Sequence, residues 1–132
     1  MSLKFEEKSK SLLFVATGSL LSEVIQAARN LMIEDIKTDI YCLRFLTGLD
    51  FDEIFALAEG RDGVVFVEDG VGSGGIGEAL EQEFFKRGFT RTAVKALPER
   101  FLSQGTRSEI CEATGLDPRS LAECGYKVVY KK

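Results

Sequence analysis

The sequence predicts a three-layer α/β/α fold, in which helices cover both faces of a mostly parallel sheet of four to five strands. Two observations lead to this class. Apolar runs of strand length alternate with amphipathic helical patterns three times in succession. The 132 residues contain no long linker, internal repeat or low-complexity tract. We therefore expect one domain over residues 1–132, with Met1–Leu3 interpreted as a cloning remnant.

Four short apolar runs are predicted to form the strands. The first run is apolar almost throughout and ends at Gly18, as expected for a strand that is buried on both faces. The fourth run is closed by Pro98, which cannot continue a central strand. The predicted strands are Leu12–Thr17, Lys37–Leu46, Gly63–Asp69 and Thr92–Leu97.

Three helices are predicted between the strands, because apolar residues recur there three and four positions apart. The predicted helices are Leu20–Met32, Phe51–Glu59 and Ile76–Arg87. Their boundaries are expected at Ser19, at the capping pair Asp50 and Glu53, and at the stop glycines Gly60 and Gly88. The third helix is expected to face the core with Ile76, Ala79, Leu80 and Phe84.

The C-terminal part of the chain shows two further helix starts. Thr106 and Glu109 form a capping box that opens a short helix ending at Gly115. Asp117 before Pro118 has the pattern of an N-cap followed by proline in the first turn. The tail from Tyr126 onward is compatible with one more helical turn, a short edge strand or a frayed end.

The composition narrows the range of functions. The formal net charge is −4 and no basic stripe is present, so we expect no nucleic-acid partner. No apolar run reaches membrane-spanning length and the N-terminus is too polar for a signal peptide, so we expect no membrane partner and a cytoplasmic location. The chain has no histidine and therefore lacks the commonest general base and a usual zinc ligand. The three cysteines, Cys42, Cys111 and Cys124, are interpreted as unpaired thiols in a reducing compartment.

A glycine-rich stretch, "EDGVGSGGIG", follows the third predicted strand and contains the Gly-x-Gly-x-x-Gly pattern twice. One interpretation is a dinucleotide site, with the phosphates at the helix N-terminus and Glu99 near the ribose. Two observations argue against a dinucleotide site. The negative charges of Glu68 and Asp69 would repel a pyrophosphate, and the dinucleotide-binding glycine motif normally follows the first strand of the fold and not the third. A purely structural turn is the second interpretation.

A third interpretation comes from resemblance. The segments "ATGS", "LRF" with "LD", "VEDGVGSGGIGEAL" and "LPERFLSQGTRSEICEATGLD" occur in this order. Together they resemble the C-terminal domain of transketolase-like thiamine-diphosphate enzymes, and the last segment is similar to the 1-deoxy-D-xylulose-5-phosphate synthase branch. The likeness runs from about Leu12 to Leu121. The chain departs from the family pattern at Thr47-Gly48, where Lys-Pro is usual, and at Ala96 and Gln104.

The resemblance implies a parent enzyme that condenses pyruvate with glyceraldehyde 3-phosphate, for isoprenoid, thiamine and pyridoxal synthesis. It implies that thiamine diphosphate and magnesium are held by N-terminal and middle domains that this chain does not contain. The chain is then a packing and assembly domain with no catalytic residue, cofactor-binding residue or metal ligand of its own. Its expected partners are those two domains and a dimer partner.

Two loops are expected to carry the role of this domain. A domain-interface or anion-site loop comprises Glu68, Asp69, Gly70, Gly74, Gly75 and Gly77. A family-signature loop comprises Leu97, Pro98, Glu99, Phe101, Gln104 and Gly105. Arg44 and Asp50 are further loop-end charges that either contact a partner or form internal salt bridges and caps.

Two alternatives stay open at this point. One is the equivalent domain of a transketolase subunit or of the beta subunit of a 2-oxo-acid dehydrogenase. The other is a free-standing nucleotide- or anion-binding α/β module.

Overall fold

The computed structural model of the protein describes residues 10–17, 20–43, 51–68, 76–96 and 116–130. Four strands lie in this part of the chain: β1 (Lys10–Thr17), β2 (Ile36–Leu43), β3 (Gly63–Glu68) and β4 (Thr92–Ala96). Its helices are α1 (Leu21–Ile33), α2 (Phe51–Ala58), α3 (Ile76–Lys86) and α5 (Pro118–Val129). The predicted alternation of strands and helices is confirmed.

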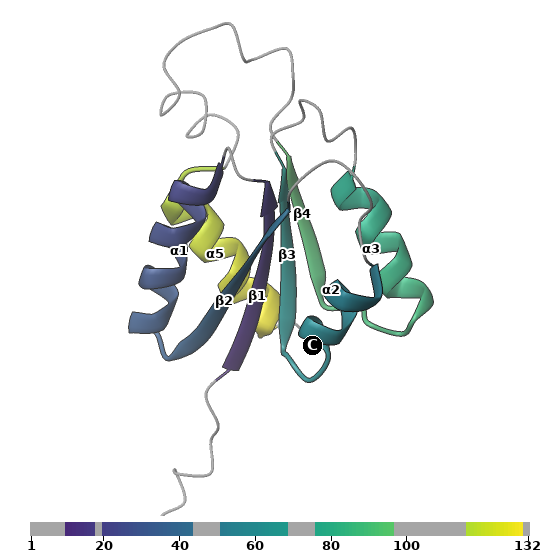
Figure 1. The fold of residues 1–132 in the computed structure, drawn as a ribbon. Helices are drawn as coiled ribbons and strands as arrows, with labels where there is room; N and C mark the ends of the chain where they lie inside the picture. Colours follow the sequence, from purple (N-terminus) through teal and green to yellow (C-terminus); the bar gives the residue numbers. More distant parts are fainter. Residues whose placement is uncertain (1–9, 18–19, 44–50, 69–75, 97–115, 131–132) are drawn as a thin grey trace, which may run out of the picture.

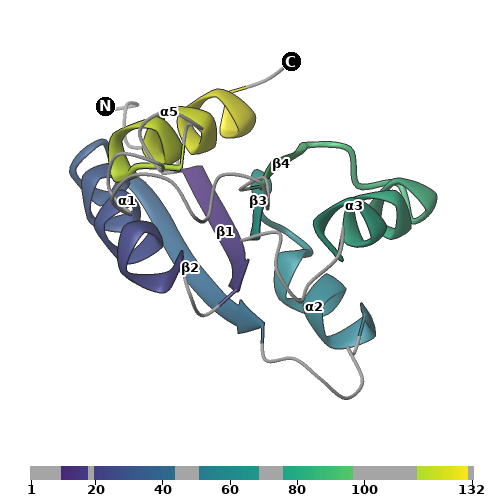
Figure 2. The same ribbon diagram turned by 90° about the horizontal axis from the view of Figure 1, so that it is seen from above.

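The four strands form one parallel sheet in the order β2-β1-β3-β4. Helices α1 and α5 cover one face of the sheet, and α2 and α3 cover the other (Figures 1 and 2). The predicted three-layer α/β/α class is therefore confirmed. Because β1 and β3 are central and covered on both sides, they are apolar nearly throughout, whereas the edge strand β2 carries exposed polar residues.

The sheet separates two apolar cores. Successive side chains of a strand point to opposite faces, so Leu12, Phe14 and Ala16 of β1 pack under α1 and α5. Leu13 and Val15 pack under α2 and α3. Burying a Leu or Phe side chain stabilises a fold by about 1.5–3 kcal/mol, so these two cores, more than helix propensity, hold the short helices on the sheet.

An aromatic cluster fills the core beneath α2 and α3. The ring of Phe84 on α3 lies edge-on to three neighbours, with centroid distances of 5.1 Å to Phe55, 5.3 Å to Phe66 and 5.6 Å to Phe89. These neighbours come from α2, β3 and the segment after α3. Phe84 therefore packs against residues from α2, from β3 and from the segment after α3.

Helix α5 lies close against β1 and α1. A Cβ atom on Gly125 would be 2.6 Å from Cδ2 of Leu12 and 3.1 Å from Cδ1 of Leu31, so any other residue here would have to displace these leucine side chains or move the helix. The N-cap predicted at Asp117 is confirmed, since its carboxylate accepts a hydrogen bond of 3.2 Å from the backbone nitrogen of Ser120. The tail from Tyr126 to Val129 is helical, which settles the three options that the sequence pattern left open.

Two local predictions are wrong. The N-cap position of α1 is Leu20 rather than the predicted Ser19, and the side chain of Leu20 makes no capping hydrogen bond; Ser19 itself lies outside the described residues. Ala79 is exposed, because the buried stripe of α3 runs through Gly77, Leu80 and Phe84, and Ala79 projects to the side of it. The stops at Gly60 and Gly88 are confirmed by positive φ angles of 84° and 89°.

Some predicted features lie outside the described residues: Arg44–Leu46 at the end of the second strand, Asp50, and the helix predicted from Thr106 to Gly115. In the described part of the chain, no helix has the length and hydropathy needed to cross a lipid bilayer.

Candidate functional site

The strand order places a topological switch point between β1 and β3. From β1 the chain passes through α1 to β2 on one side, and from β3 it passes through α3 to β4 on the other. The two connecting helices lie on opposite faces of the sheet (Figure 2). In open α/β sheets this arrangement leaves a crevice at the carboxyl ends of the two central strands, where ligands usually bind. A ligand site is therefore expected at the carboxyl ends of β1 and β3.

Two buried polar side chains mark this position. Thr17 ends β1 with 4% of its surface exposed, and Glu68 ends β3 with 3% exposed. Ala16 pairs with Val67, so the next residue on each strand brings Thr17 and Glu68 side by side. Both follow the alternation of residues that face α2 and α3, and their side chains share that face of the sheet.

The carboxylate of Glu68 is bound to the first turn of α3. Its Oε1 atom accepts a hydrogen bond of 2.6 Å from the backbone nitrogen of Gly77, the second residue of the helix. The first N–H groups of a helix have no partner within the helix, and they favour a negative charge. The side chain of Glu68 supplies this acceptor from inside the protein.

Gly77 is needed for this contact. A Cβ atom at this position would lie 2.7 Å from Oε1 of Glu68, 3.1 Å from Cγ1 of Val94 and 3.4 Å from Cβ of Phe66. Any other residue would push the carboxylate away or move α3 off the sheet. The last glycine of the motif is therefore explained by a buried carboxylate, and the Gly77 N–H that a phosphate would use is already paired.

The hydroxyl of Thr17 differs from the other buried polar groups. Its Oγ1 atom is buried and has no hydrogen-bond partner among the described residues. Thr92, which is also buried, donates from its hydroxyl to Glu81 at 2.6 Å. A buried, unpaired hydroxyl is uncommon in folded proteins and marks a position where water or a bound group is expected.

The sequence predicts only part of this site. Glu68 and Gly77 lie together at the switch point as described above, and Thr17 was not predicted. Its signal in the sequence is weak, since a single threonine before Gly18 is common at strand ends. The other predicted loop residues lie outside the described residues: Asp69, Gly70, Gly74, Gly75, Leu97, Pro98, Glu99, Phe101, Gln104 and Gly105.

The described residues offer little for metal or thiol chemistry. Within the ranges that the structure covers, no group of three or more His, Cys, Asp and Glu side chains is arranged to hold a metal ion. Cys42 and Cys124 are both free thiols, as predicted for these two positions. Burial raises the pKa of Cys124, and the charges of Lys95 and Lys127 oppose that rise without reversing it. The thiol of Cys124 is therefore protonated at neutral pH.

Comparison with known proteins identifies relatives along nearly the whole chain. The family model "Transketolase, C-terminal domain" matches residues 2–121. The 1-deoxy-D-xylulose-5-phosphate synthase of Treponema pallidum (strain Nichols) is 36% identical over 117 residues, which cover 88% of this chain and 19% of that protein. The synthase of the same name from Chlorobium luteolum is 34% identical over 109 residues, which cover 82% of this chain and 17% of that protein. The chain thus spans about a fifth of the length of these curated relatives.

A solved structure supports the fold independently. A chain titled "Split gene transketolase, inactive beta4 tetramer" superposes with a TM-score of 0.75 at 20% sequence identity, over 92% of this chain and 40% of that chain. The match confirms the parallel four-stranded architecture described above. With the family model covering residues 2–121 and the fold in agreement, this chain belongs to the transketolase C-terminal domain family.

Proposed function

We propose that this chain is the C-terminal domain of a 1-deoxy-D-xylulose-5-phosphate synthase and that it serves packing and assembly rather than catalysis. One observation carries the proposal: the similarity to the Treponema pallidum synthase covers 88% of this chain but 19% of that enzyme. A complete synthase of that kind therefore needs further domains. The parent enzyme would condense pyruvate with glyceraldehyde 3-phosphate, as the resemblance implies.

The cofactors belong to those other domains under this proposal. Thiamine diphosphate, which supplies stabilisation of a carbanion when it is bound, and magnesium would be held by the N-terminal and middle domains. The sequence has no histidine and so lacks the commonest general base, which is consistent with that division.

The switch-point residues support an architectural role. The buried carboxylate of Glu68 is held by the N–H of Gly77 and so fixes the start of α3 relative to β3. Such a contact sets where the glycine-rich loop leaves the sheet and where it enters the helix. We propose that this loop then contacts a neighbouring domain or the dimer partner.

The synthase branch is favoured over the rival branches by the sequence comparisons. The two curated relatives at 36% and 34% identity both carry the synthase name, whereas the transketolase structure is 20% identical and informs on the fold alone. That structure is titled as a split gene enzyme, so the missing domains are expected either upstream on the same chain or on a partner subunit. We further propose that residues 1–132 form one domain and that the parent enzyme is cytoplasmic.

A chimera tests the proposal. The region of the Treponema pallidum synthase that matches this chain is replaced by residues 2–121 of this protein, and formation of 1-deoxyxylulose 5-phosphate is measured. The chimera should turn over substrate, while the same synthase truncated before that region and the isolated 132-residue chain should not. The family signature between Leu97 and Gly105 offers a matched control, because a chimera in which only that loop keeps the Treponema sequence should retain activity.

Two results would overturn the proposal. Turnover, or tightly bound thiamine diphosphate, in the isolated chain would show that it carries reactive machinery of its own. A chimera that is folded and dimeric by light scattering but inactive would show that this domain cannot serve a synthase of that branch.

A further inference from the structure

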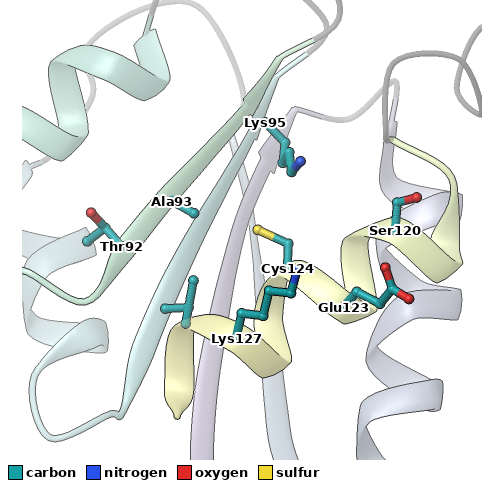
Figure 3. Close-up of a pocket in the computed structure, with 8 residues that line it drawn as sticks. Thr92, Ala93, Lys95, Ser120, Glu123, Cys124 and Lys127 are labelled. Atoms are coloured by element: carbon teal, nitrogen blue, oxygen red, sulfur yellow. The ribbon is translucent and has the colours of Figure 1, made fainter. Parts of the chain in front are cut away.

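A hollow lies between the edge strand β4 and helix α5, lined by other residues than those of the switch point (Figure 3). Its volume is about 500 Å³, which is within the range of small-molecule sites. Residues from β4 form one wall and residues from three turns of α5 form the other. No role was expected for this region from the sequence, and the function proposed above does not use it.

The polar lining of this cavity is positively charged overall. Lys95 comes from β4 and Lys127 from α5, and Glu123 supplies the opposing carboxylate. Figure 3 shows the Cys124 thiol directed from α5 toward β4, with Lys95 and Lys127 on either side of it. Lys95, Cys124 and Lys127 all line the same hollow, and the charges of the two lysines oppose the rise in the pKa of Cys124 that burial causes. A local excess of positive charge is notable on a chain whose formal net charge is −4.

The remaining lining suits a ligand with an organic part. Ala93 and Val128 give the cavity an apolar wall, and Ser120 adds a hydroxyl that can donate or accept a hydrogen bond. Two ammonium groups match the two negative charges of a phosphate monoester, and they would repel a metal cation or an amine.

We propose that the cavity between β4 and α5 binds the phosphate monoester of a small organic molecule, with the phosphate between Lys95 and Lys127 and the organic part against Ala93 and Val128. The site is separate from the switch point. Its existence does not depend on which enzyme the domain belongs to.

Nuclear magnetic resonance titration of the 132-residue chain tests the proposal directly. Backbone amide shifts are followed while inorganic phosphate, glycerol 3-phosphate or glycerol is added at constant ionic strength. Saturable shifts at Lys95, Cys124 and Lys127 are expected with both phosphates, with tighter binding of glycerol 3-phosphate, and none are expected with glycerol. Absence of saturation with glycerol 3-phosphate at millimolar concentrations would overturn the proposal, and so would equal binding of glycerol.

Charge-changing variants locate the site. Lys95→Gln and Lys127→Gln should each weaken the binding of glycerol 3-phosphate about fivefold or more, since each removes one ammonium contact. Glu123→Gln should strengthen it, because a repelling carboxylate is lost. Lys37→Gln is the matched control, since Lys37 is an exposed lysine on β2 at the opposite edge of the sheet. Equal weakening by Lys37→Gln, or no weakening by the two cavity variants, would overturn the proposal.

The Cys124 thiol offers a second readout. Bound phosphate would offset the charges of Lys95 and Lys127, raise the pKa of Cys124 further and slow its alkylation by iodoacetamide at a fixed pH. Mass spectrometry of the peptide that contains Cys124 measures this rate, with the Cys42 peptide as the internal reference. An alkylation rate of Cys124 that is the same with and without saturating glycerol 3-phosphate would contradict the placement of the ligand. None of these results bears on the chimera, so the two proposals fail separately.

Discussion

Glu68 and Gly77 are joined across the glycine-rich loop by a buried hydrogen bond, with 2.6 Å between Oε1 of the carboxylate and the backbone nitrogen. The contact closes a loop of the chain by linking the last residue of β3 to the second residue of α3. It explains why an acidic residue and a glycine stand nine positions apart in this motif. The structural interpretation of that motif is supported by this contact, whereas a phosphate at the same N–H would have to displace a carboxylate.

Gly77→Ala should destabilise the domain. The added methyl group would lie 2.7 Å from Oε1 of Glu68, so either the carboxylate or the helix must shift. We expect the free energy of unfolding to fall by about 1–3 kcal/mol, as is usual for an extra methyl group in a packed site. Urea denaturation followed by circular dichroism measures the change. Gln82→Ala on the exposed side of α3 is the control and should stay within about 0.5 kcal/mol of wild type. A Gly77→Ala variant as stable as the control would refute the packing argument.

Removing the carboxylate should also cost stability, by a different route. Glu68→Ala leaves the N–H of Gly77 without this acceptor in a buried position, which costs about 1–3 kcal/mol. Glu68→Gln keeps an acceptor oxygen of similar shape and should lose less. In the double variant with Gly77→Ala the two losses should not add, because the atom that clashes with the new methyl group is gone. Additive losses in the same denaturation assay would mean that the two residues act independently.

The hydroxyl of Thr17 can be tested by an exchange that preserves shape. Thr17→Val removes a buried oxygen that has no partner among the described residues, so the free energy of unfolding should stay the same or rise by up to about 1 kcal/mol. Thr17→Ser keeps the hydroxyl but loses a methyl group and should be less stable by about 0.8 kcal/mol. A clear loss of stability in Thr17→Val would show instead that the hydroxyl has a partner, such as a bound water.

The N-cap of α5 predicts a specific pH dependence. Burial raises the pKa of Asp117, but hydrogen bonds from Ser120, from its own backbone and from Arg119 outweigh that effect, and the pKa lies below its usual value. A carboxyl group with a lowered pKa in the folded state stabilises the fold above its unfolded pKa, and this contribution is lost as the pH falls through the folded pKa. Asp117→Ala should therefore cost about 0.5–2 kcal/mol at neutral pH, and the difference from wild type should shrink in acid.

Asp117→Ser is the matched control for that experiment, because serine caps a helix without ionising. Its stability relative to Asp117→Ala should change little between pH 7 and acid, while wild type loses its advantage over both. Urea denaturation across a pH series gives the comparison. If wild type and Asp117→Ala differ by the same amount at every pH, the ionised carboxylate is not what caps α5.

The regular elements could be predicted because their signals are local. Strand β3 is predicted from a short apolar run. Helices α2 and α3 end two residues before Gly60 and Gly88, and the positive φ angles of these glycines follow from a local rule for helix ends. The error at Ala79 has a tertiary cause. Ala79 has the spacing expected for the apolar stripe of α3, but burial depends on how the helix is rotated against the sheet. In the structure α3 turns Gly77 toward the sheet, and Ala79 is exposed.

The candidate sites could be predicted only in part. The glycine-rich motif marks Glu68 and Gly77 as candidate site residues. Their contact depends on the distance between the end of β3 and the start of α3, which the sequence does not give. Lys95 and Lys127 lie far apart in the chain and belong to separate motifs, so no spacing rule connects them. They share a cavity because α5 packs on the β4 side of the sheet.

The sequence by itself determined the order of strands and helices, the α/β class and the family, because periodicity, turn residues and motif segments are all encoded locally. Only the tertiary structure decided that β1 and β3 flank the switch point, that Glu68 accepts a hydrogen bond from the first turn of α3, and that Lys95 and Lys127 line one cavity. The physical reason is that hydrogen-bonding partners, burial and electric fields depend on distances between atoms from different segments. Those distances exist only after the sheet has assembled.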